Sequence, residues 1–165
     1  MKLAEFNTAD PSAAADILKP CLDVRRWAAA ITAARPFPSK AALLESAAHA
    51  AEPFTAAEIE AAMAHHPRIG ERPTAGTTEA AMSRSEQASM DPADTNVVEA
   101  LASGNRAYEE KFGRVFLIRA AGRSATEILA ALTARLTNSP AEENIIVAQQ
   151  LREIALLRLE GVISE

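Results

Sequence analysis

The sequence predicts an all-α fold, a single-domain compact bundle of about seven to nine helices. Hydrophobic residues make up 48% of the chain but aromatic residues only 4%. Much of the apolar content is therefore alanine, the residue with the highest helix propensity. Only six glycines are present, and no long run alternates apolar and polar residues as a half-buried strand would. With 165 residues, the chain suits one domain, which we expect to span residues 1–165.

Three capping boxes mark positions where helices are expected to begin. In such a box a Ser or Thr hydroxyl accepts a hydrogen bond from the backbone N–H three residues later, and a Glu at that later position accepts one in return. The boxes are Thr55–Glu58, Ser124–Glu127 and Ser139–Glu142. The last box is expected to open the longest helix, which presents Ile154 and Leu157 on its apolar face and ends at Gly161.

Single residues mark further helix ends. Asp23 is expected to cap a helix that stops before Pro36, because the residue that precedes a proline is disfavoured in the helical conformation. Ser39 is expected to open another helix. The spacing of apolar residues predicts a helix over residues 95–112, Val98 among its inward positions, which Gly113 ends.

The net charge of the chain restricts the kinds of partner that we expect. The formal net charge is −5, whereas phosphate binding needs clustered Lys and Arg, so we expect no nucleic-acid partner. A small anionic substrate needs only one or two positive groups and is not excluded. Cys21 is the only cysteine, which rules out an intramolecular disulfide and favours a reducing compartment. Since no signal-peptide pattern and no bilayer-spanning apolar stretch is found, we expect a cytoplasmic protein with no membrane partner.

The most irregular stretch, residues 67–78, is the first place to look for function. His66 precedes Pro67, which biases it out of the helical conformation and puts its imidazole at a helix end, a reasonable position for an acid–base group. The competing interpretation is that His65 and His66 are surface or capping histidines. A metal site that combines them with His49 is a weaker alternative, because no second ligand lies at the spacing of one helical turn.

A polar helix face is expected after this loop. Ser83, Glu86 and Gln87 are three and four residues apart, so on a helix they share one face. A hydroxyl, a carboxylate and an amide on one face could hold a polar ring. Considered alone, the pattern is more simply explained by a solvated helix face.

Four motifs in a fixed order make the sequence resemble a known family. They are His66-Pro67-Arg68-Ile69-Gly70, Ser83-x-x-Glu86-Gln87, Asn105-x-x-Tyr108-x-x-Lys111-Phe112-Gly113 and Phe116-x-Ile118-x-Ala120. Together they resemble the OHCU decarboxylases, which act on 2-oxo-4-hydroxy-4-carboxy-5-ureidoimidazoline. The resemblance spans nearly the whole chain, since Trp27 and the segment 153–159 also fit the family.

The resemblance implies a set of site residues. The catalytic histidine of the family falls on His66 and its catalytic glutamate on Glu86. The substrate-contacting residues fall on Pro67, Ser83, Gln87, Ile118 and Ala120, the last two through backbone groups. The arginine that holds the substrate carboxylate falls on Arg158, with Arg152 or Arg119 as alternatives.

The resemblance also implies a reaction. The expected enzyme is a carboxy-lyase that converts the ureidoimidazoline to (S)-allantoin in urate breakdown, with no metal and no organic cofactor. Its expected partners are the small-molecule substrate and a second copy of the chain in a homodimer. Three alternatives stay open at this point: a non-catalytic helical interaction module, a metal-dependent hydrolase, and a decarboxylase or hydrolase that acts on a related ureido heterocycle.

Overall fold

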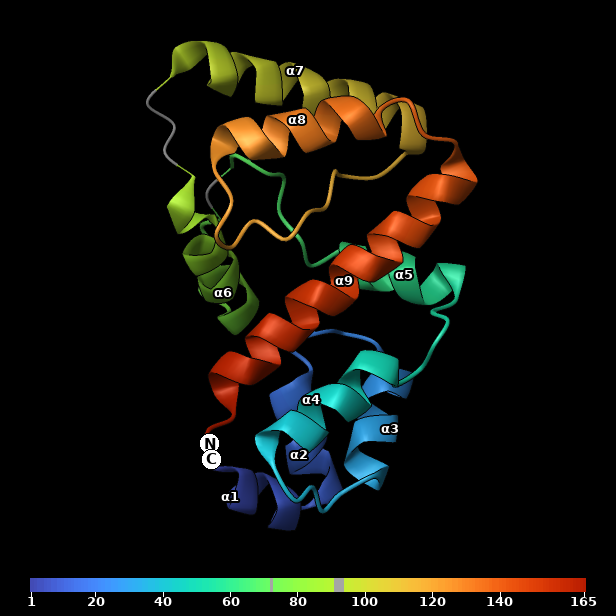
Figure 1. The fold of residues 1–165 in the computed structure, drawn as a ribbon, viewed down its shortest axis with the longest axis vertical. Helices are drawn as coiled ribbons and strands as arrows, with labels where there is room; N and C mark the ends of the chain where they lie inside the picture. Colours follow the sequence, from blue (N-terminus) through green and yellow to red (C-terminus); the bar gives the residue numbers. More distant parts are fainter. Residues whose placement is uncertain (72, 91–93) are drawn as a thin grey trace. The chain divides into compact units, whose positions relative to one another are not determined.

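The computed structural model of the chain is built from α-helices (Figure 1). It describes residues 1–71, 73–90 and 94–165. These ranges hold nine α-helices and one short 3-10 helix: α1 (Leu3–Thr8), α2 (Pro11–Leu18), α3 (Arg25–Ala33), α4 (Lys40–His49), α5 (Ala56–Met63), α6 (Thr78–Glu86), η1 (Gln87–Ser89), α7 (Thr95–Phe112), α8 (Ala125–Arg135) and α9 (Pro140–Val162). Their only β-type pairing is an isolated bridge between Lys2 and Ser164, so the all-α prediction is confirmed.

The helices form two compact units. Unit 1 comprises residues 1–62 and 152–165, and unit 2 comprises residues 63–151. Helix α9 therefore supplies its first half to unit 2 and its second half to unit 1. That residues 1–165 behave as one domain stays a prediction.

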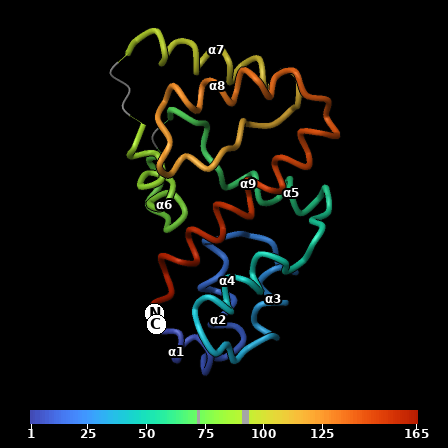
Figure 2. Tube along the Cα trace, viewed as in Figure 1, coloured from blue at the N-terminus to red at the C-terminus, as the bar shows by residue number. Residues whose placement is uncertain are grey.

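Unit 1 has Trp27 in its core. The indole is 1% exposed, and its N–H donates to the carbonyl oxygen of Ala47 at 2.9 Å, which satisfies the polar end of a buried ring. The two ends of the chain lie next to each other in this unit (Figure 2), where the N–H of Leu3 donates to the carbonyl oxygen of Ser164 at 2.7 Å. Other large side chains of the unit that are fully buried are those of Phe6, Leu18, Ile31, Leu43, Leu159 and Ile163.

Unit 2 is organised around α7 and α8, which run side by side (Figure 1, Figure 2). A Cβ atom at Gly104 would come within 2.6 Å of Cδ2 of Leu132, so the missing side chain permits the close approach of the two helices. Tyr108 is fully buried and packs against the rings of Phe112 and Phe116, with ring centroids 4.6 and 5.3 Å away.

The predicted helix starts are confirmed at the capping boxes. At Thr55–Glu58 and Ser139–Glu142 the hydroxyl accepts from the Glu N–H at 3.2 Å, and the carboxylate accepts in return at 2.8 and 2.7 Å. The hydroxyl of Ser124 caps α8 in the same way at 3.2 Å. Helix α7 has the predicted bounds, and Gly113 follows it at φ 70°, the left-handed conformation that favours glycine.

Two of the predicted helix ends are wrong. Val24, and not Asp23, occupies the N-cap position of α3. Val24 is buried, so packing of this side chain decides where the chain enters the helix. Gly161 does not end α9, which continues to Val162. The reason lies in the next residue: Ile163 is 1% exposed, and the helix extends far enough to bury it.

The apolar faces of the long helices are also shifted from the predicted ones. Leu157 of α9 and Val98 of α7 were expected to point inward but are 37% and 42% exposed. The buried positions of α9 are Glu143, Val147, Leu151, Ile154, Ala155, Arg158 and Leu159. The spacing of apolar residues predicts that a helix has a buried face, but charged residues that are paired inside the fold move the centre of that face.

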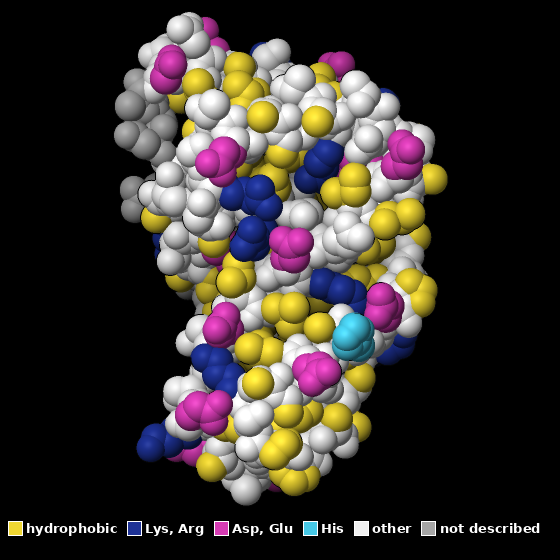
Figure 3. Space-filling view, viewed as in Figure 1, with side chains coloured by type: hydrophobic (Ala, Val, Ile, Leu, Met, Phe, Trp, Pro, Cys, Tyr) yellow, Lys and Arg dark blue, Asp and Glu magenta, His cyan; other side chains and the backbone are white. Residues whose placement is uncertain are grey.

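Charged residues of both signs lie among hydrophobic ones on the face drawn in Figure 3. They are not gathered there into a large patch of one sign, which agrees with the modest net charge of −5. Within the described ranges, none of the helices combines the length and the apolarity that a bilayer span requires.

Candidate active site

The first segment of the candidate site follows helix α5. The backbone N–H of His66 donates to the carbonyl oxygen of Met63, the last residue of α5, at 3.1 Å. The chain has left the helical conformation at His66, as the proline that follows requires. The side chain of His66 is half-buried. The prediction that this imidazole stands just beyond a helix end is confirmed. Arg72, which belongs to the predicted loop, lies outside the described residues.

The second segment is the C-terminal end of α6. Ser83 is 3% exposed, and Glu86, the last residue of the helix, is half-buried. Gln87 already belongs to η1, so the α-helical geometry that the sequence predicted for all three residues holds only for the first two. The Oε1 atom of Gln87 accepts a hydrogen bond from the N–H of Gly70 at 3.1 Å. This bond joins the end of α6 to the segment that begins with His66.

Helix α7 holds the same segment from another direction. The Nδ2 atom of Asn105 donates to the carbonyl oxygen of Ile69 at 2.9 Å. Arg68 and Glu109 form an ion pair with Nε and Oε1 2.6 Å apart. The glutamate raises the pKa of the Arg68 guanidinium above its usual value, chiefly through this hydrogen bond. The loop is thus tied to two helices of unit 2 through both backbone and side-chain groups.

The third segment, residues 115–120, has no regular secondary structure, and residues 116–118 are buried. Its backbone polar groups therefore need partners outside a helix or sheet ladder. The partners are side chains. Nη1 of Arg135 donates to the carbonyl oxygen of Leu117 at 2.7 Å, and Oγ of Ser89 donates to that of Ala120 at 3.4 Å. The N–H of Arg119 donates to Oε1 of Gln150 at 2.8 Å.

The short helix η1 connects the three segments. Gln87 at its start contacts Gly70 of the first segment, and Ser89 at its end contacts Ala120 of the third. Since η1 continues directly from α6, residues far apart along the chain are brought to one region of unit 2. The structure therefore brings together the elements that carry His66, Glu86 and the backbone of residues 118–120.

A buried ion pair lies behind the third segment. Arg135 is 8% exposed and Glu143 fully buried. The Nε atom of Arg135 donates to Oε1 of Glu143 at 2.7 Å, and the hydroxyl of Tyr108 donates to the same oxygen at 2.6 Å. Burial by itself would raise the pKa of the Glu143 carboxyl, but hydrogen bonds from Arg135, Tyr108 and Asn138 outweigh it and hold the pKa below its usual range.

Two of the three candidate carboxylate-binding arginines belong to unit 1. Arg158 is 8% exposed, and its Nη1 donates to the carbonyl oxygen of Pro20 at 3.0 Å. Arg152 donates through Nη1 to Ala48 O and Ala50 O at 3.1 and 2.8 Å. Burial lowers the pKa of the Arg152 guanidinium. The third candidate, Arg119, belongs to unit 2 and is half-buried.

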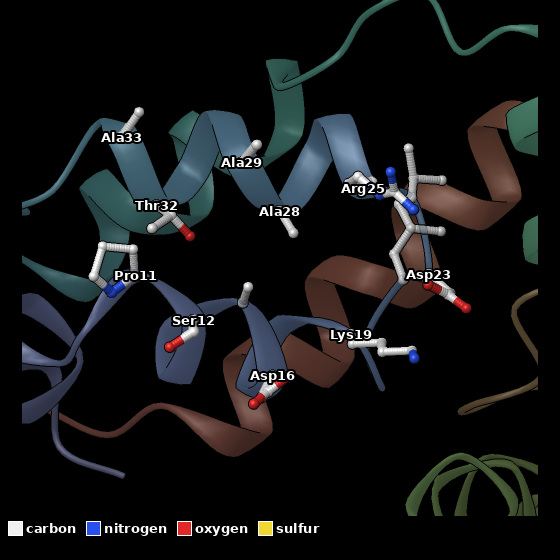
Figure 4. A pocket seen from close by; sticks show the side chains of 13 residues that line it. Pro11, Ser12, Asp16, Lys19, Asp23, Arg25, Ala28, Ala29, Thr32 and Ala33 are labelled. Atoms are coloured by element: carbon white, nitrogen blue, oxygen red, sulfur yellow. The ribbon is translucent and has the colours of Figure 1, made fainter.

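Each unit contains a cavity, and no predicted site residue lines either of the two. A cavity of about 730 Å³ lies in unit 1 between α2 and α3, where Ala28 and Thr32 point toward α2 (Figure 4). A second cavity, of about 330 Å³, lies in unit 2 between the segment 68–71 and α7. Asn105 lines it, but the Oδ1 atom of this residue is not accessible to solvent.

The other two histidines differ from His66 in their exposure to solvent. His65 and His49 are exposed, and His49 lies 3.5 Å from the Glu52 carboxylate. In the part of the chain that the structure describes, no three His, Cys, Asp or Glu side chains come together in a group that could hold a metal ion.

The family model for OHCU decarboxylase matches residues 7–160. The chain belongs to the OHCU decarboxylase family. An OHCU decarboxylase from Amia calva is 31% identical over 138 residues, which cover 82% of this chain and 79% of that protein. The uric acid degradation bifunctional protein TTL of Arabidopsis thaliana is 35% identical over 107 residues, or 63% of this chain. The match spans 33% of the length of the Arabidopsis protein.

Two solved structures agree with the fold. A crystal structure of OHCU decarboxylase in the presence of (S)-allantoin superposes with a TM-score of 0.70 at 26% identity and covers 88% of this chain and 96% of that chain. A structure of (S)-allantoin synthase gives a TM-score of 0.72 over 99% of this chain and 54% of that chain. At 16% identity the second comparison supports the fold alone. The family resemblance inferred from the four motifs is confirmed.

Sequence reasoning missed the residues that hold the OHCU decarboxylase segments in place. Arg135, Glu143 and Gln150 were not among the expected site residues. One signal could have identified Arg135: it continues the helical spacing of Ile128 and Leu132, which puts a charged side chain on the buried face of α8. A charge at such a position requires a partner, and Glu143 provides it.

Proposed function

We propose that this chain decarboxylates 2-oxo-4-hydroxy-4-carboxy-5-ureidoimidazoline to (S)-allantoin in urate breakdown, without a metal or organic cofactor. Membership of the OHCU decarboxylase family over residues 7–160 carries the proposal. The hydrogen bond between Gly70 and Gln87 supports it locally, because it ties the segment that starts at His66 to the helix that ends at Glu86.

The substrate can serve as its own electron sink. When the bond between the ring and the carboxylate breaks, CO2 leaves and the electron pair moves toward the adjacent ring C=N, whose nitrogen gains a proton. The resulting enol then takes a proton at the carbon that carries the ureido group, while the hydroxyl becomes the carbonyl of allantoin. The protein has to orient the carboxylate, move protons and stabilise the developing charge.

We assign the proton transfers to His66 and Glu86. The imidazole of His66 exchanges a proton with the 4-hydroxyl or the ring and delivers one to a single face, which sets the (S) configuration. Glu86 either holds the tautomer of His66 or accepts a hydrogen bond from the substrate hydroxyl. A proton-transfer group of this kind contributes a factor of about 10²–10⁴ to the rate.

We assign substrate binding to the other residues that the family resemblance implies. Pro67 and the hydroxyl of Ser83 contact the ring, and the backbone groups of Ile118 and Ala120 meet its amides. Because Oε1 of Gln87 accepts from Gly70, the amide nitrogen of Gln87 is the group that would donate to the substrate. Arg158 holds the carboxylate, and Arg152 and Arg119 are the alternatives.

The function is tested by generating the ureidoimidazoline from urate in situ and following circular dichroism as allantoin forms. The substrate is expected to decay unaided but without chiral control. The chain should accelerate the decay and yield optically active allantoin. Racemic product formed at the unaided rate would reject the proposal.

The role of the histidine is tested by His66→Ala. This variant should lose the acceleration while it keeps the helical circular dichroism of the parent chain, because the substitution removes the proton carrier at a position outside the helices. His65→Ala is the matched control, since His65 is an exposed neighbour, and it should keep normal rates. Near-normal turnover by His66→Ala would remove this imidazole from the mechanism.

Glu86 and Arg158 are tested separately. Glu86→Gln should be severely impaired, whereas Ser85→Ala on the exposed side of the same helix end should not be. Arg158→Ala should chiefly raise KM because it weakens binding of the substrate carboxylate. An unchanged KM would move the assignment to Arg152 or Arg119, whose alanine variants would then be measured in the same assay.

We further infer that the chain works in the cytoplasm as a homodimer. The family resemblance supports the dimer, and a single cysteine supports a reducing compartment. Light scattering coupled to size-exclusion chromatography would test the dimer, and a mass equal to one chain would reject it.

A further inference from the structure

The backbone of Ile118 has both of its polar groups oriented by side chains of other helices. The carbonyl of Leu117 and the N–H of Ile118 belong to one planar trans peptide, so they point in opposite directions. Arg135 donates to that carbonyl from Nη1 at 2.7 Å. The position of Arg135 therefore fixes the direction of the Ile118 N–H, which points away from the guanidinium.

The same argument applies on the other side of the residue. The carbonyl of Ile118 shares a planar peptide with the N–H of Arg119. That N–H donates to Oε1 of Gln150 at 2.8 Å. The carbonyl of Ile118 therefore points away from Gln150, and α9 fixes its direction as α8 fixes that of the N–H.

Arg135 is held too firmly to act as a mobile surface arginine. A guanidinium is a planar, rigid fork of donors, and two of its nitrogens, Nε and Nη2, bond to Oε1 of Glu143. Its carbon lies 4.4 Å from the ring centroid of Phe116. Because two nitrogens and one face of the guanidinium are held, the third nitrogen, Nη1, can only point at the carbonyl of Leu117.

Stability alone does not explain this arrangement. Replacing a buried ion pair by well-packed apolar residues is often neutral or stabilising, because both charges lose their hydration. An apolar side chain, however, could not hold a carbonyl in an irregular segment. The buried pair is the feature expected where one backbone direction has to be specified.

We propose that Arg135 and Gln150 are positioning residues that aim the N–H and the C=O of Ile118 at the substrate. The inference rests on the proposed function, in which the backbone of this residue meets the ring. A donor and an acceptor on one residue recognise the edge of a cyclic amide or ureide, which offers a carbonyl and an N–H. Neither side chain itself touches the reacting atoms.

The experiment uses three variants of residues in α9. Gln150→Leu removes the acceptor and keeps the size, Gln150→Glu keeps an acceptor, and Gln149→Leu makes the same change at an exposed neighbour. Each is compared with the parent chain for kcat, KM, the enantiomeric excess of allantoin and the amide ¹H–¹⁵N resonances of residues 118 and 119. Arg135→Lys, which retains one donor but not the fork, is a second test of the same peptide.

For Gln150→Leu we expect the two amide resonances to shift, kcat/KM to fall roughly 10- to 100-fold, and the enantiomeric excess to drop, because misplacement of binding groups by about 1 Å can cost that much. Gln150→Glu should restore most of the rate, and Gln149→Leu should match the parent. A purely structural role would lower the melting temperature without changing the enantiomeric excess.

The outcomes separate this inference from the proposed function. If the parent chain is active and Gln150→Leu shifts the amide resonances but keeps the parental rate and enantiomeric excess, the positioning role is overturned while the function stands. If the parent chain fails to act on the ureidoimidazoline, the proposed function falls and the positioning role falls with it. If Gln150→Leu does not fold, Arg135→Lys and Gln150→Glu are judged by the same measurements.

Discussion

Two arginines of unit 1 and one of unit 2 satisfy backbone carbonyls in different settings. In unit 1, Arg35 and Arg152 donate to the C-cap carbonyls of α1 and α4, on Ala9 and Ala50, at 2.8 Å each. Both arginines are half-buried. In unit 2, Arg135 is 8% exposed and holds a carbonyl of an irregular segment with Glu143 as its buried counter-ion.

The difference reflects what each carbonyl requires. The last carbonyls of a helix have no partner within the helix, and water or a flexible side chain can satisfy them. A half-exposed arginine there keeps part of its hydration and needs no fixed counter-charge. The carbonyl of Leu117 is buried in a segment without secondary structure, so its partner has to be buried as well. Arg35 and Arg152 thus satisfy carbonyls at helix ends, whereas Arg135 defines a single backbone direction.

Glu143→Gln is expected to have the largest effect on this comparison. It leaves the Arg135 charge buried without a counter-ion, which should destabilise the protein by about 3–5 kcal/mol. Urea unfolding measures the loss, and Glu110→Gln, at an exposed position of α7, is the control. A loss below about 1 kcal/mol would show that Arg135 regains solvent and that the two units do not differ in this respect.

Calorimetry on the same variant also tests the domain prediction. If residues 1–165 form one cooperative domain, a single transition should move to lower temperature as a whole. Two transitions, of which only one responds to Glu143→Gln, would instead make unit 2 a separate folding domain.

A smaller effect is expected at the exposed ion pair of unit 1. Hydrogen bonding from Arg26 lowers the pKa of Glu58 from 4.5 to about 2, against the opposing effect of burial. The carboxylate therefore stabilises the folded state above about pH 4.5, and this contribution disappears as the pH falls toward 2. At neutral pH, Glu58→Gln should cost about 1 kcal/mol.

The pH series gives the discriminating measurement. As the pH falls through about 2, the parent chain and Glu58→Gln should converge in urea stability, because the parental carboxyl then becomes protonated in the folded state as well. A constant difference between pH 7 and pH 2 would mean that the carboxylate charge contributes nothing and that shape alone matters at this position.

The smallest effect is expected at Gly161. This glycine lies within α9, and a Cβ atom there would meet no atom within 4 Å. Gly161→Ala should therefore stabilise the chain by about 0.5–1 kcal/mol, the difference in helix propensity between the two residues. Thermal unfolding would detect the gain as a modest rise in Tm, and a fall in Tm would indicate that the end of α9 is not helical in solution.

Much of the fold could be predicted because local sequence determines it. The capping boxes at Thr55 and Ser139 and the helix end at Gly113 were predicted correctly, since every group involved lies within a few residues. The start of α3 and the end of α9 were not, because Val24 and Ile163 are buried, and burial depends on the rest of the fold.

The same difference between local patterns and long-range contacts applies to the candidate site. Spacing and the family motifs led to His66 and Glu86, whose roles stay predictions, and to the family itself. The contacts from Asn105 to Ile69 and from Arg135 to Leu117 could not be predicted. Each joins an irregular backbone to a helix many residues away, and no local pattern specifies which carbonyl a buried donor will meet.

The close approach of α7 and α8 depends on the absence of a side chain at Gly104. Leu132 fills the place that a methyl group on Gly104 would occupy, and Leu132 shares α8 with Arg135. A mutation that adds one carbon at position 104 would push against this helix without touching any residue assigned to chemistry. Such a mutation would act first on the packing of α7 against α8, and through α8 on the position of Arg135.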